Sequence, residues 1–589
     1  MHVKGPKSYT VNGEKHTTFR KATLERGLIE NDDTLSQCLT KASMFQFPHS
    51  LRRLFATILI FCNPMDVRRL WDEHYDSLSE DYRRRFQNSD QVQSLVLKDI
   101  LVFLQSMGKS LDDFDLPRIN SKHLDLGGCR ELQEESSIIV EDDHLRAKDN
   151  LNPDQKFAYD TIMRHVDGNY PGVFFVDGPG GTGKTYLYNA LLAEVRSRGQ
   201  IAIATASSGA TANNMPGGRT AHSRIKIPLI LSNNSLCNIS KQSGTAQLLR
   251  RAKLIIWDKA SMAKRQAVEA FDRTIQDIIG VSLPFGGKVM VFGGDFRQVL
   301  PVIKKGIRAQ IVDSSLRMSP LWPGITKMRL SVNMRARTDP WFSDFLLRVG
   351  NGEEEVIEGS FIRIPDEMTI PYTTESETRS KKALISAIFP SIEVNGTSPY
   401  GQERIYYNFD EAKDDINNYY PVEFLNSLSV AGLPPHRLRL KIGCPVILLR
   451  NIDPSNGLCN GTRLICKGFQ RNVIDAEIAA GQHAGKRVFL PRIPLCPSEN
   501  DMYPFKLKRK QFPIRLSFAM TINKAQGQTV PHVGVYLPDS VFSHGQLYVA
   551  LSRGISHERV KVLVRPTQIF HQPGVYTANV VYREVLQDA

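Results

Sequence analysis

The glycine-rich sequence Gly178-Pro179-Gly180-Gly181-Thr182-Gly183-Lys184-Thr185 follows the apolar run Val173–Val176 and leads into a helical pattern. A strand, a glycine loop and a helix start in this order place backbone N–H groups and the positive end of a helix dipole around an oligophosphate. In such a loop Lys184 reaches the β- and γ-phosphates of a nucleotide, and the Thr185 hydroxyl ligates Mg²⁺. The sequence therefore predicts a site for ATP or GTP; the alternative is an ordinary glycine-rich turn.

Strand–helix alternation surrounds this loop from Leu151 onward. Short apolar runs are separated by stretches with helical periodicity, and Gly199 would close the helix predicted at Thr185–Arg198. The predicted strands are Gly172–Val176, Ile201–Thr205, Leu254–Trp257 and Lys288–Phe292. Such alternation implies a parallel sheet with helices on both faces and a site at the carboxyl ends of the strands. Residues 151–332 are therefore expected to form a RecA-like α/β lobe.

The second half of a nucleotide site should be an apolar strand that ends in an acidic residue, and Leu254–Asp258 supplies one. Asp258 is expected to hold Mg²⁺ through water. An ATPase usually has a glutamate next, which polarises the attacking water, but this chain has Lys259. A cation cannot accept a proton, and a general base contributes about 10²–10⁴-fold in rate, so we expect weak hydrolysis with nucleotide binding partly retained. An equal alternative is a sequence artefact or a decayed gene copy, because one nucleotide change converts a glutamate codon to lysine.

Three polar residues further along the chain could complete the site. Gln298 ends the block Gly293–Gln298 after a predicted strand, where a glutamine can report a γ-phosphate to a neighbouring nucleic-acid groove. Arg335 and Arg553 lie far downstream, and a guanidinium from a second lobe would neutralise charge that develops on the γ-phosphate. Taken singly, Gln298 could belong to a turn, and each arginine could be a surface ion-pair partner.

The composition narrows the class of partner and compartment. The 589 residues include 75 basic and 61 acidic ones, a formal charge of +14. A basic surplus favours a polyanionic partner, although it can also serve solubility alone. No apolar run approaches the roughly 20 residues of a membrane span. The eight cysteines include no C-x-x-C pair, so neither a zinc site nor a disulfide framework is indicated, and a reducing compartment fits.

Four further segments flank the predicted lobe. Residues 1–150 are read as an N-terminal helical extension and linker of unknown role, with apolar positions at three- and four-residue spacing between 44 and 107. Residues 333–438 are expected to begin a second RecA-like lobe, and 513–589, where strand–helix alternation returns, to complete it. Residues 439–512 contain short predicted strands separated by Gly and Pro, which suggests a small inserted β module.

In their order, these blocks resemble the Pif-one family of superfamily-one DNA helicases, most closely the forms carried by plant Helitron transposons. The resemblance covers about residues 150–580, and residues 44–83 look like the segment upstream of the helicase in those transposon proteins. The further blocks that carry it are Leu151–Gln155, Gly218–Ser223, Phe424–Leu428, Gly457–Arg463 and Phe518–Thr529. The resemblance implies two RecA-like lobes with an inserted SH3-like module, and ATP-driven 5′→3′ translocation on single-stranded DNA. It also implies roles in repair, recombination and telomere maintenance for cellular members, and in strand displacement for transposon members.

The resemblance also implies roles for individual residues. ATP would be held by Gln155, Gly178, Gly180, Gly181, Thr182, Gly183, Lys184 and Thr185, with Mg²⁺ at Thr185 and Asp258. The catalytic group would be Lys184, Asp258, Gln298, Arg335 and Arg553. The DNA track would include Thr205, Ser207, His222, Thr521, Asn523 and Lys524. Gln155 would read adenine in competition with a capping-box role, and His222 read alone would be an ordinary surface histidine. A nuclear monomer acting on single-stranded DNA and duplex junctions, with no membrane partner, is expected.

Two departures from the family pattern stand out. Lys259 is the first, and the second lies at Glu403–Tyr407, where family members usually continue into a strand, a turn and a helix before the Tyr-Tyr block. A missing strand and helix would leave a gap in the second sheet and expose an edge. The basic run Lys506–Lys510, followed by Phe512, could line a DNA groove or be a solvated charge run.

Three functions therefore compete. The leading one is an ATP-dependent DNA helicase. The second is a catalytically dead, nucleotide-gated DNA-binding protein, which Lys259 favours. The third, a GTPase or small-molecule kinase, explains neither the downstream arginine blocks nor the positive charge.

Overall fold

The computed structural model describes residues 9–11, 14–16, 32–62, 64–106, 109–119, 130–390, 403–412, 419–430, 432–453, 456–471, 473–481, 483–497, 505–566 and 573–586. The chain divides into two compact units, and each combines two stretches of sequence. The N-terminal unit contains residues 1–127 and 399–519, and the phosphate-loop unit contains residues 128–398 and 520–589. The predicted domain boundaries stay predictions, but the phosphate loop and both downstream arginines share one unit.

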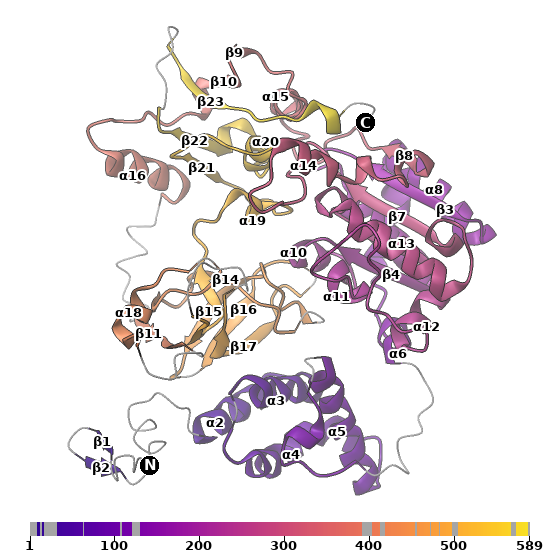
Figure 1. The fold of residues 1–589 in the computed structure, drawn as a ribbon, viewed down its shortest axis with the longest axis vertical. Coiled ribbons are helices and arrows are strands. Elements are labelled where there is room, and N and C mark those ends of the chain that lie inside the picture. The colour runs from indigo at the N-terminus through magenta and orange to yellow at the C-terminus, as the bar shows by residue number, and fades with distance from the viewer. Residues whose placement is uncertain are drawn as a thin grey trace. The chain divides into compact units, whose positions relative to one another are not determined.

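The phosphate-loop unit contains a six-stranded parallel sheet with strand order β5-β4-β6-β7-β3-β8. Figure 1 labels β4, β7, β3 and β8 of this sheet. Its strands are β3 (Gly172–Asp177), β4 (Ile201–Ala206), β5 (Arg219–Thr220), β6 (Ala252–Asp258), β7 (Val289–Gly294) and β8 (Thr326–Arg329). The four strands predicted from apolar runs are β3, β4, β6 and β7, each within two residues of its predicted ends. The predicted α/β class is confirmed.

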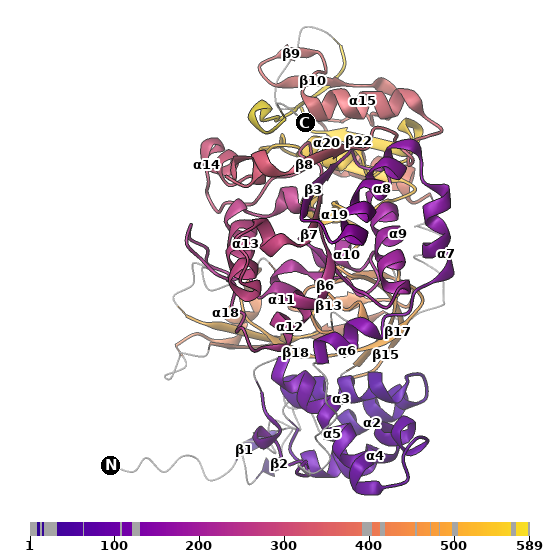
Figure 2. The same cartoon turned by 90° about the vertical axis from the view of Figure 1, so that its right-hand side faces the viewer.

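Helices cover both faces of this sheet, as Figure 2 shows for α13 on one side and α8 and α9 on the other. One apolar core joins strand residues such as Phe174 and Ile256 to α8 (Pro153–Gly168) and α9 (Lys184–Ser197). The other joins Phe175 and Trp257 to α12 (Gly244–Arg251) and α13 (Arg265–Ile279). Adjacent strand residues face opposite cores because side chains alternate along a strand, and each buried large side chain contributes about 1.5–3 kcal/mol.

Helix α8 begins with the predicted capping box. The Asn152 side chain accepts a hydrogen bond from the Gln155 backbone N–H at 2.9 Å, and the Gln155 side chain accepts one from the Asn152 N–H at 3.1 Å. Pro153 occupies the first turn, where a missing N–H costs nothing. The capping role of Gln155 is therefore confirmed.

The segment directly before α8, read from the sequence as part of a linker, packs on the sheet instead. It forms α6 (Arg130–Ser136), α7 (Asp142–Arg146) and the 3-10 helix η3 (Ala147–Asn150). Glu135 on α6 is 3% exposed and forms ion pairs with Arg196, at 2.7 Å, and with Arg224. An acidic residue of this segment thus supplies a partner for two buried arginines; residues 120–129 of the predicted extension and linker lie outside the described residues.

The rest of the phosphate-loop unit contains a second, smaller α/β region with its own apolar core. Strands β21 (Val533–Leu537) and β22 (Val560–Val564) are parallel, and β23 (Val575–Ala578), β10 (Phe361–Ile364) and β9 (Val356–Glu358) form an antiparallel sheet in that order. Its helices are α15 (Pro340–Asn351), α16 (Glu377–Ile388), α19 (Ile522–Ala525) and α20 (Gln546–Leu551). The strand and helix expected to be missing near Glu403 stay a prediction.

The N-terminal unit combines helices with antiparallel strands. Its helices are α2 (Asp32–Ser43), α3 (Pro48–Cys62), α4 (Val67–Arg83), α5 (Ser89–Ser106) and α18 (Val422–Ser427). A five-stranded sheet has the order β17-β16-β15-β14-β20, with strands β14 (Pro445–Leu448), β15 (Arg463–Phe469), β16 (Val473–Ile478), β17 (Arg487–Pro491) and β20 (Ile514–Leu516). The helical core includes Val473 and Phe489 of this sheet, so the helices and the sheet share one core.

Within the basic run Lys506–Lys510, Arg509 fits neither of the two arrangements considered from the sequence. It lies in β19 (Leu507–Gln511), the middle strand between β12 (Phe409–Ala412) and β18 (Ile493–Leu495). Arg509 is 1% exposed and forms a bidentate pair with Asp410 at 2.8 and 2.7 Å. A buried, paired arginine is not part of a solvated charge run and is not available to a DNA phosphate.

Shorter elements complete the described chain. They are β1 (Tyr9–Val11), β2 (Glu14–His16), β11 (Arg404–Tyr407), β13 (Arg437–Leu440), α10 (Gly209–Ala212), α11 (Ala221–Ile225), α14 (Arg308–Asp313) and the 3-10 helices η1 (Leu111–Asp113), η4 (Ala260–Met262), η5 (Pro284–Gly287), η6 (Leu316–Met318), η7 (Trp322–Gly324), η8 (Asp366–Met368), η10 (His557–Arg559) and η11 (Arg583–Val585). Over the described ranges, no helix has the length and apolar character needed to cross a membrane.

Candidate active site

The glycine-rich loop connects β3 to α9, as the sequence predicts. Gly181 and Gly183 adopt positive φ angles of 99° and 77°, a conformation that favours glycine. A Cβ atom on Gly183 would also overlap the Gln155 side-chain amide, which donates to the Thr182 carbonyl at 3.0 Å. Gln155 therefore stabilises the loop through the Thr182 carbonyl, in addition to capping α8. No side chain among the described residues caps the first turn of α9. The backbone N–H groups of this turn can therefore bind an anion.

A cavity of about 350 Å³ lies against this loop, within the size range of small-molecule sites. It is lined by Gly180, Gly181, Thr182, Gly183, Lys184, Thr185, Thr211, Asn214, Asp258, Lys259, Gln298, Met334, Arg335, Gly527 and Arg553. All five residues predicted to be catalytic are in this set, and so are the predicted nucleotide-binding residues other than Gln155 and Gly178. The structure thus brings together positions more than 350 residues apart in the chain.

Lys184 is the first residue of α9 and Asp258 the last residue of β6, and both line the cavity. The Lys184 ammonium is buried and donates to the loop carbonyls of Gly178 and, at 3.1 Å, Pro179. Burial lowers the pKa of Lys184, and the nearby carboxylates of Asp295 and Asp258 act in the opposite direction. Asp258 is 2% exposed and accepts the Lys259 backbone N–H at 2.8 Å.

Lys259 occupies the place next to Asp258 where hydrolysis would need a base. Its ammonium faces the cavity and donates to the Gln298 side-chain oxygen at 3.3 Å. Burial is the main cause that lowers the pKa of Lys259 to about 8; the neighbouring Lys184 and Arg553 lower it further, while Asp258 opposes them. The side chain is thus mostly a cation at pH 7 and cannot take a proton from water there.

Gln298 connects the cavity residue Lys259 to Asp295 and Gln526. Its side-chain oxygen also accepts from the Gln526 amide at 2.8 Å, and its own amide donates to Asp295 at 2.9 Å. Gln298 is 1% exposed, so these contacts fix its orientation. A change at the Lys259 ammonium can therefore reach Gln526, which precedes the cavity-lining Gly527.

The two predicted arginines approach the loop from the second α/β region. Arg335 donates to the Ser552 carbonyl at 2.7 Å, and Arg553 is 3% exposed and donates to the Val549 and Gln528 carbonyls at 2.8 and 2.9 Å. Burial and the like charge of Arg335 lower the pKa of Arg553 to about 9. Among the described residues neither guanidinium forms an ion pair with a carboxylate, so the alternative of surface ion pairs does not hold for them.

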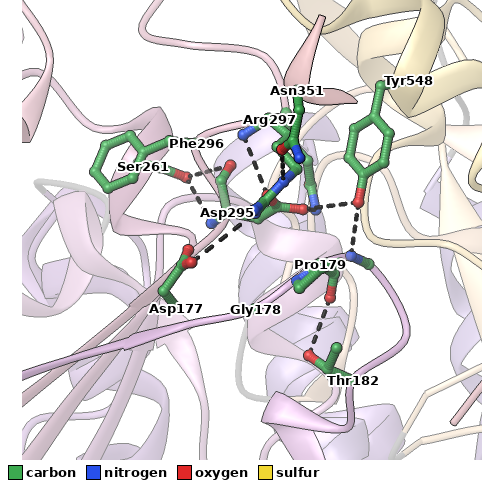
Figure 3. A network of polar contacts seen from close by, with 12 residues as sticks. Asp177, Gly178, Pro179, Thr182, Ser261, Asp295, Phe296, Arg297, Asn351 and Tyr548 are labelled. Carbon is green, nitrogen blue, oxygen red and sulfur yellow. Dashed lines mark hydrogen bonds and ion pairs between the residues drawn. The ribbon is translucent and has the colours of Figure 1, made fainter. Parts of the chain in front are cut away.

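A buried polar network that the sequence did not indicate lies behind the cavity (Figure 3). The Tyr548 hydroxyl accepts the Gly180 N–H at 2.9 Å and donates to Asp295 at 3.1 Å. Arg297 donates to Asp295 at 3.4 Å and forms an ion pair with Asp177 at 3.9 Å. Figure 3 shows the Tyr548 hydroxyl between the loop and Asp295, so this one side chain joins α20 to the loop and to the end of β7. Tyr548 lies five residues before Arg553, and the sequence predicts a role only for the arginine.

Of the six predicted DNA-track residues, one is buried, one is half-buried and four are exposed. Thr205 is buried and donates to the Ile256 carbonyl at 2.8 Å. The Ser207 hydroxyl donates to the Lys259 carbonyl at 2.7 Å and accepts the Trp257 indole N–H at 3.0 Å. The exposed members are His222 on α11 and Thr521, Asn523 and Lys524 at α19. Thr205 and Ser207 thus support the strand ends, and the other four side chains are exposed.

The oxygen donors at Thr185 and Asp258 suit Mg²⁺, because hard cations prefer hydroxyl, carboxylate and water ligands. Both residues line the same cavity. The residues present therefore fit a magnesium ion in their donor chemistry, although a second cation, Lys259, stands beside them.

Comparisons with known proteins point to one family. Residues 150–359 match the family described as PIF1-like helicase, and residues 423–469 match the 2B domain of DNA helicase Pif1. The ATP-dependent DNA helicase PIF1 of Danio rerio is 28% identical over 417 residues, which cover 66% of this chain and 58% of that relative. The ATP-dependent DNA helicase Pif1 of Bdellovibrio bacteriovorus is 27% identical over 411 residues, 68% of this chain and 85% of that relative.

Among solved structures, one of two coordinating Pif1 helicases at forked double-stranded DNA is similar with a TM-score of 0.50 at 23% identity. The match covers 70% of this chain and 92% of that chain, and it supports the fold alone. The matched part of this chain spans less than two thirds of the length of the vertebrate relatives.

Proposed function

We propose that the chain, whose residues 150–359 match the PIF1-like helicase family and residues 423–469 the Pif1 2B domain, is an ATP-dependent DNA helicase that moves 5′→3′ on single-stranded DNA. The observation that carries the proposal is the position of Arg335 and Arg553. Both line the cavity that Lys184 lines, and neither is paired with a carboxylate among the described residues. A buried guanidinium at Arg553 and a half-buried one at Arg335, neither with a carboxylate partner among the described residues, call for another anion, and a triphosphate supplies it.

In this proposal the phosphates of ATP lie on the loop and at the start of α9. Lys184 exchanges its contacts with the Gly178 and Pro179 carbonyls for phosphate oxygens. Thr185 and Asp258 would hold Mg²⁺, which when bound neutralises charge on the phosphate oxygens. Arg335 and Arg553 neutralise charge that develops on the γ-phosphate.

Gln298 would couple the nucleotide to movement on DNA. It already contacts Lys259 and Gln526 and anchors to Asp295, so a γ-phosphate that moves the cavity side chains changes its partners. Gln155 would read adenine from beneath the loop while it keeps the capping box.

The DNA side of the proposal rests on exposed residues. His222, Thr521, Asn523 and Lys524 would contact single-stranded DNA, and Thr205 and Ser207 would fix the strand ends behind them. The formal charge of +14 supports a polyanionic partner. Duplex junctions as substrate, a nuclear location, a monomeric state and roles in repair, recombination, telomere maintenance or Helitron transposition belong to the same proposal.

A second candidate function is favoured by Lys259: a nucleotide-gated DNA-binding protein with little hydrolysis. The Lys259 ammonium faces the cavity in the place of the expected base. The K259E variant should therefore raise the ATPase rate stimulated by a dT oligomer by about 10²–10⁴-fold over the natural chain. Lys264, exposed and five residues along, gives the matched charge reversal, and K264E should leave the rate unchanged.

The same proteins decide between the two functions when they are offered a duplex with a 5′ single-stranded tail. Unwinding by K259E but not by the natural chain supports a helicase that Lys259 has impaired. Fast ATP turnover by the natural chain would refute our account of Lys259. Binding of dT oligomers that depends on ATP and weakens steeply with salt, without unwinding by either protein, would favour the gated binding protein.

A further inference from the structure

The cavity at the phosphate loop carries an unusual charge balance. Four cationic side chains and one carboxylate line it: Lys184, Lys259, Arg335 and Arg553 against Asp258. The formal excess is three positive charges. With a glutamate at position 259 the same cavity would have three cations and two carboxylates, an excess of one. The change from glutamate to lysine thus adds two positive charges, which is the charge that one Mg²⁺ ion brings.

The Lys259 ammonium is placed where this charge acts on a ligand. The residue is 9% exposed, its ammonium is held at 3.3 Å from the Gln298 oxygen, and it lines the cavity with Lys184 and Arg553. Charges interact more strongly in such a buried site than in water, because little solvent screens them. Lys259 forms no ion pair with a carboxylate among the described residues, although the Asp258 and Asp295 carboxylates partly offset its charge.

A metal-free nucleoside triphosphate carries about four negative charges, and a site with paired carboxylates repels it. In those sites the divalent cation is needed because it neutralises the phosphate oxygens and the carboxylates together. Here one of the two carboxylates is absent and an ammonium stands in its place. The electrostatic reason for requiring the metal during binding is therefore largely removed.

We propose that this cavity binds free nucleoside triphosphate without Mg²⁺, and that the Lys259 side chain supplies the charge compensation otherwise provided by the metal. The inference rests on the proposed function in taking a triphosphate as the ligand of the loop. It makes Lys259 a residue that determines which form of the nucleotide binds.

The test is calorimetric titration of the full chain with ATP at pH 7.0, once with excess Mg²⁺ and once with EDTA. For the natural chain we expect the two dissociation constants to agree within about threefold, whereas K259E should bind at least about tenfold more weakly in EDTA than in Mg²⁺. K264E should behave like the natural chain. The K259M variant, similar in size but neutral, should fall between the two and serves if K259E does not fold.

An equal loss of affinity in EDTA for the natural chain and K259E would overturn the inference, and so would the absence of ATP binding in both conditions. The inference and the helicase proposal can fail independently of each other. Metal-independent ATP binding by the natural chain, together with a failure of K259E to unwind DNA, would support the inference and count against the helicase.

Discussion

Removal of the Tyr548 hydroxyl tests whether the network behind the cavity holds the loop. Tyr548 is 1% exposed, and its hydroxyl makes two hydrogen bonds, to the Gly180 N–H at 2.9 Å and to the Asp295 carboxylate at 3.1 Å. A neutral hydrogen bond contributes about 0.5–1.5 kcal/mol net, and one to a charged group about 1.5–3 kcal/mol. The Y548F variant should therefore be destabilised by about 2–4.5 kcal/mol. The lower end applies if Asp295 compensates through its bonds to Gln298 and the Arg297 backbone.

A second buried tyrosine of the same unit provides the control. Tyr188 on α9 is fully buried, but its hydroxyl has no hydrogen-bond partner among the described residues. The Y188F variant removes an unsatisfied polar group and should leave the stability unchanged or slightly raised. The two variants delete the same atom from the same residue type, so their difference isolates the hydrogen bonds.

Urea unfolding of the full chain without nucleotide, followed by tryptophan fluorescence, measures the difference. Three of the four tryptophans, Trp257, Trp322 and Trp341, lie in the phosphate-loop unit, so the signal reports mainly on it. Added ATP should reduce the difference in urea midpoint between Y548F and Y188F, because a phosphate oxygen can accept the Gly180 N–H in place of the hydroxyl. Equal midpoints for Y548F and Y188F would refute the argument.

Two further predictions concern buried titratable residues that do not line the cavity. His544 is fully buried; it accepts the Tyr582 N–H at 2.8 Å through Nδ1, and its Nε2 lies 2.6 Å from the Phe296 carbonyl, which requires the neutral ring. Burial lowers the pKa of His544, so the unfolded chain binds the proton more readily and stability falls as the pH drops below about 6.5, by at most about 1.4 kcal/mol per pH unit. The H544Q variant keeps a donor and an acceptor, and it should show a smaller fall in its unfolding midpoint between pH 7.5 and 5.5; an identical fall would contradict this assignment. Glu135 is buried against Arg196 and a second arginine, so E135Q should destabilise the chain by about 3–5 kcal/mol in urea unfolding, and a change below 1 kcal/mol, within the range of surface substitutions, would contradict this pairing.

The first lobe could be predicted from the sequence because its signals are local. Apolar runs such as Leu254–Trp257 can only be buried strands when helices alternate with them, and a glycine loop between strand and helix fixes where the site lies. The capping box at Asn152 and Gln155 is readable for the same reason, since it spans one helical turn. Family resemblance added the positions of the distant arginines, which local pattern alone would have left as surface residues.

Contacts that depend on tertiary structure were not predictable in this way. Neither periodicity nor charge indicates that the Tyr548 hydroxyl meets the backbone of Gly180, 368 residues earlier. Arg509 lies in a run of basic residues that suggests solvent or DNA, yet its alternate position in β19 turns it inward to Asp410. In both cases the partner comes from another element, so the residue's environment is set by the packing of the whole unit.

The backbone conformation at Lys259 does not depend on the Lys259 side chain, so a change of its charge should leave the backbone in place. The residue adopts a left-handed conformation, φ 57° and ψ 36°, which costs a non-glycine residue about 1 kcal/mol or more. Backbone contacts stabilise it: its N–H donates to Asp258 at 2.8 Å and its carbonyl accepts from Ser207 at 2.7 Å. Neither contact involves the Lys259 side chain, so a glutamate can occupy the same backbone. K259E then alters the charge in the cavity and the contact to Gln298 without rebuilding the strand end. A gain in hydrolysis or in metal dependence can accordingly be assigned to the side chain itself.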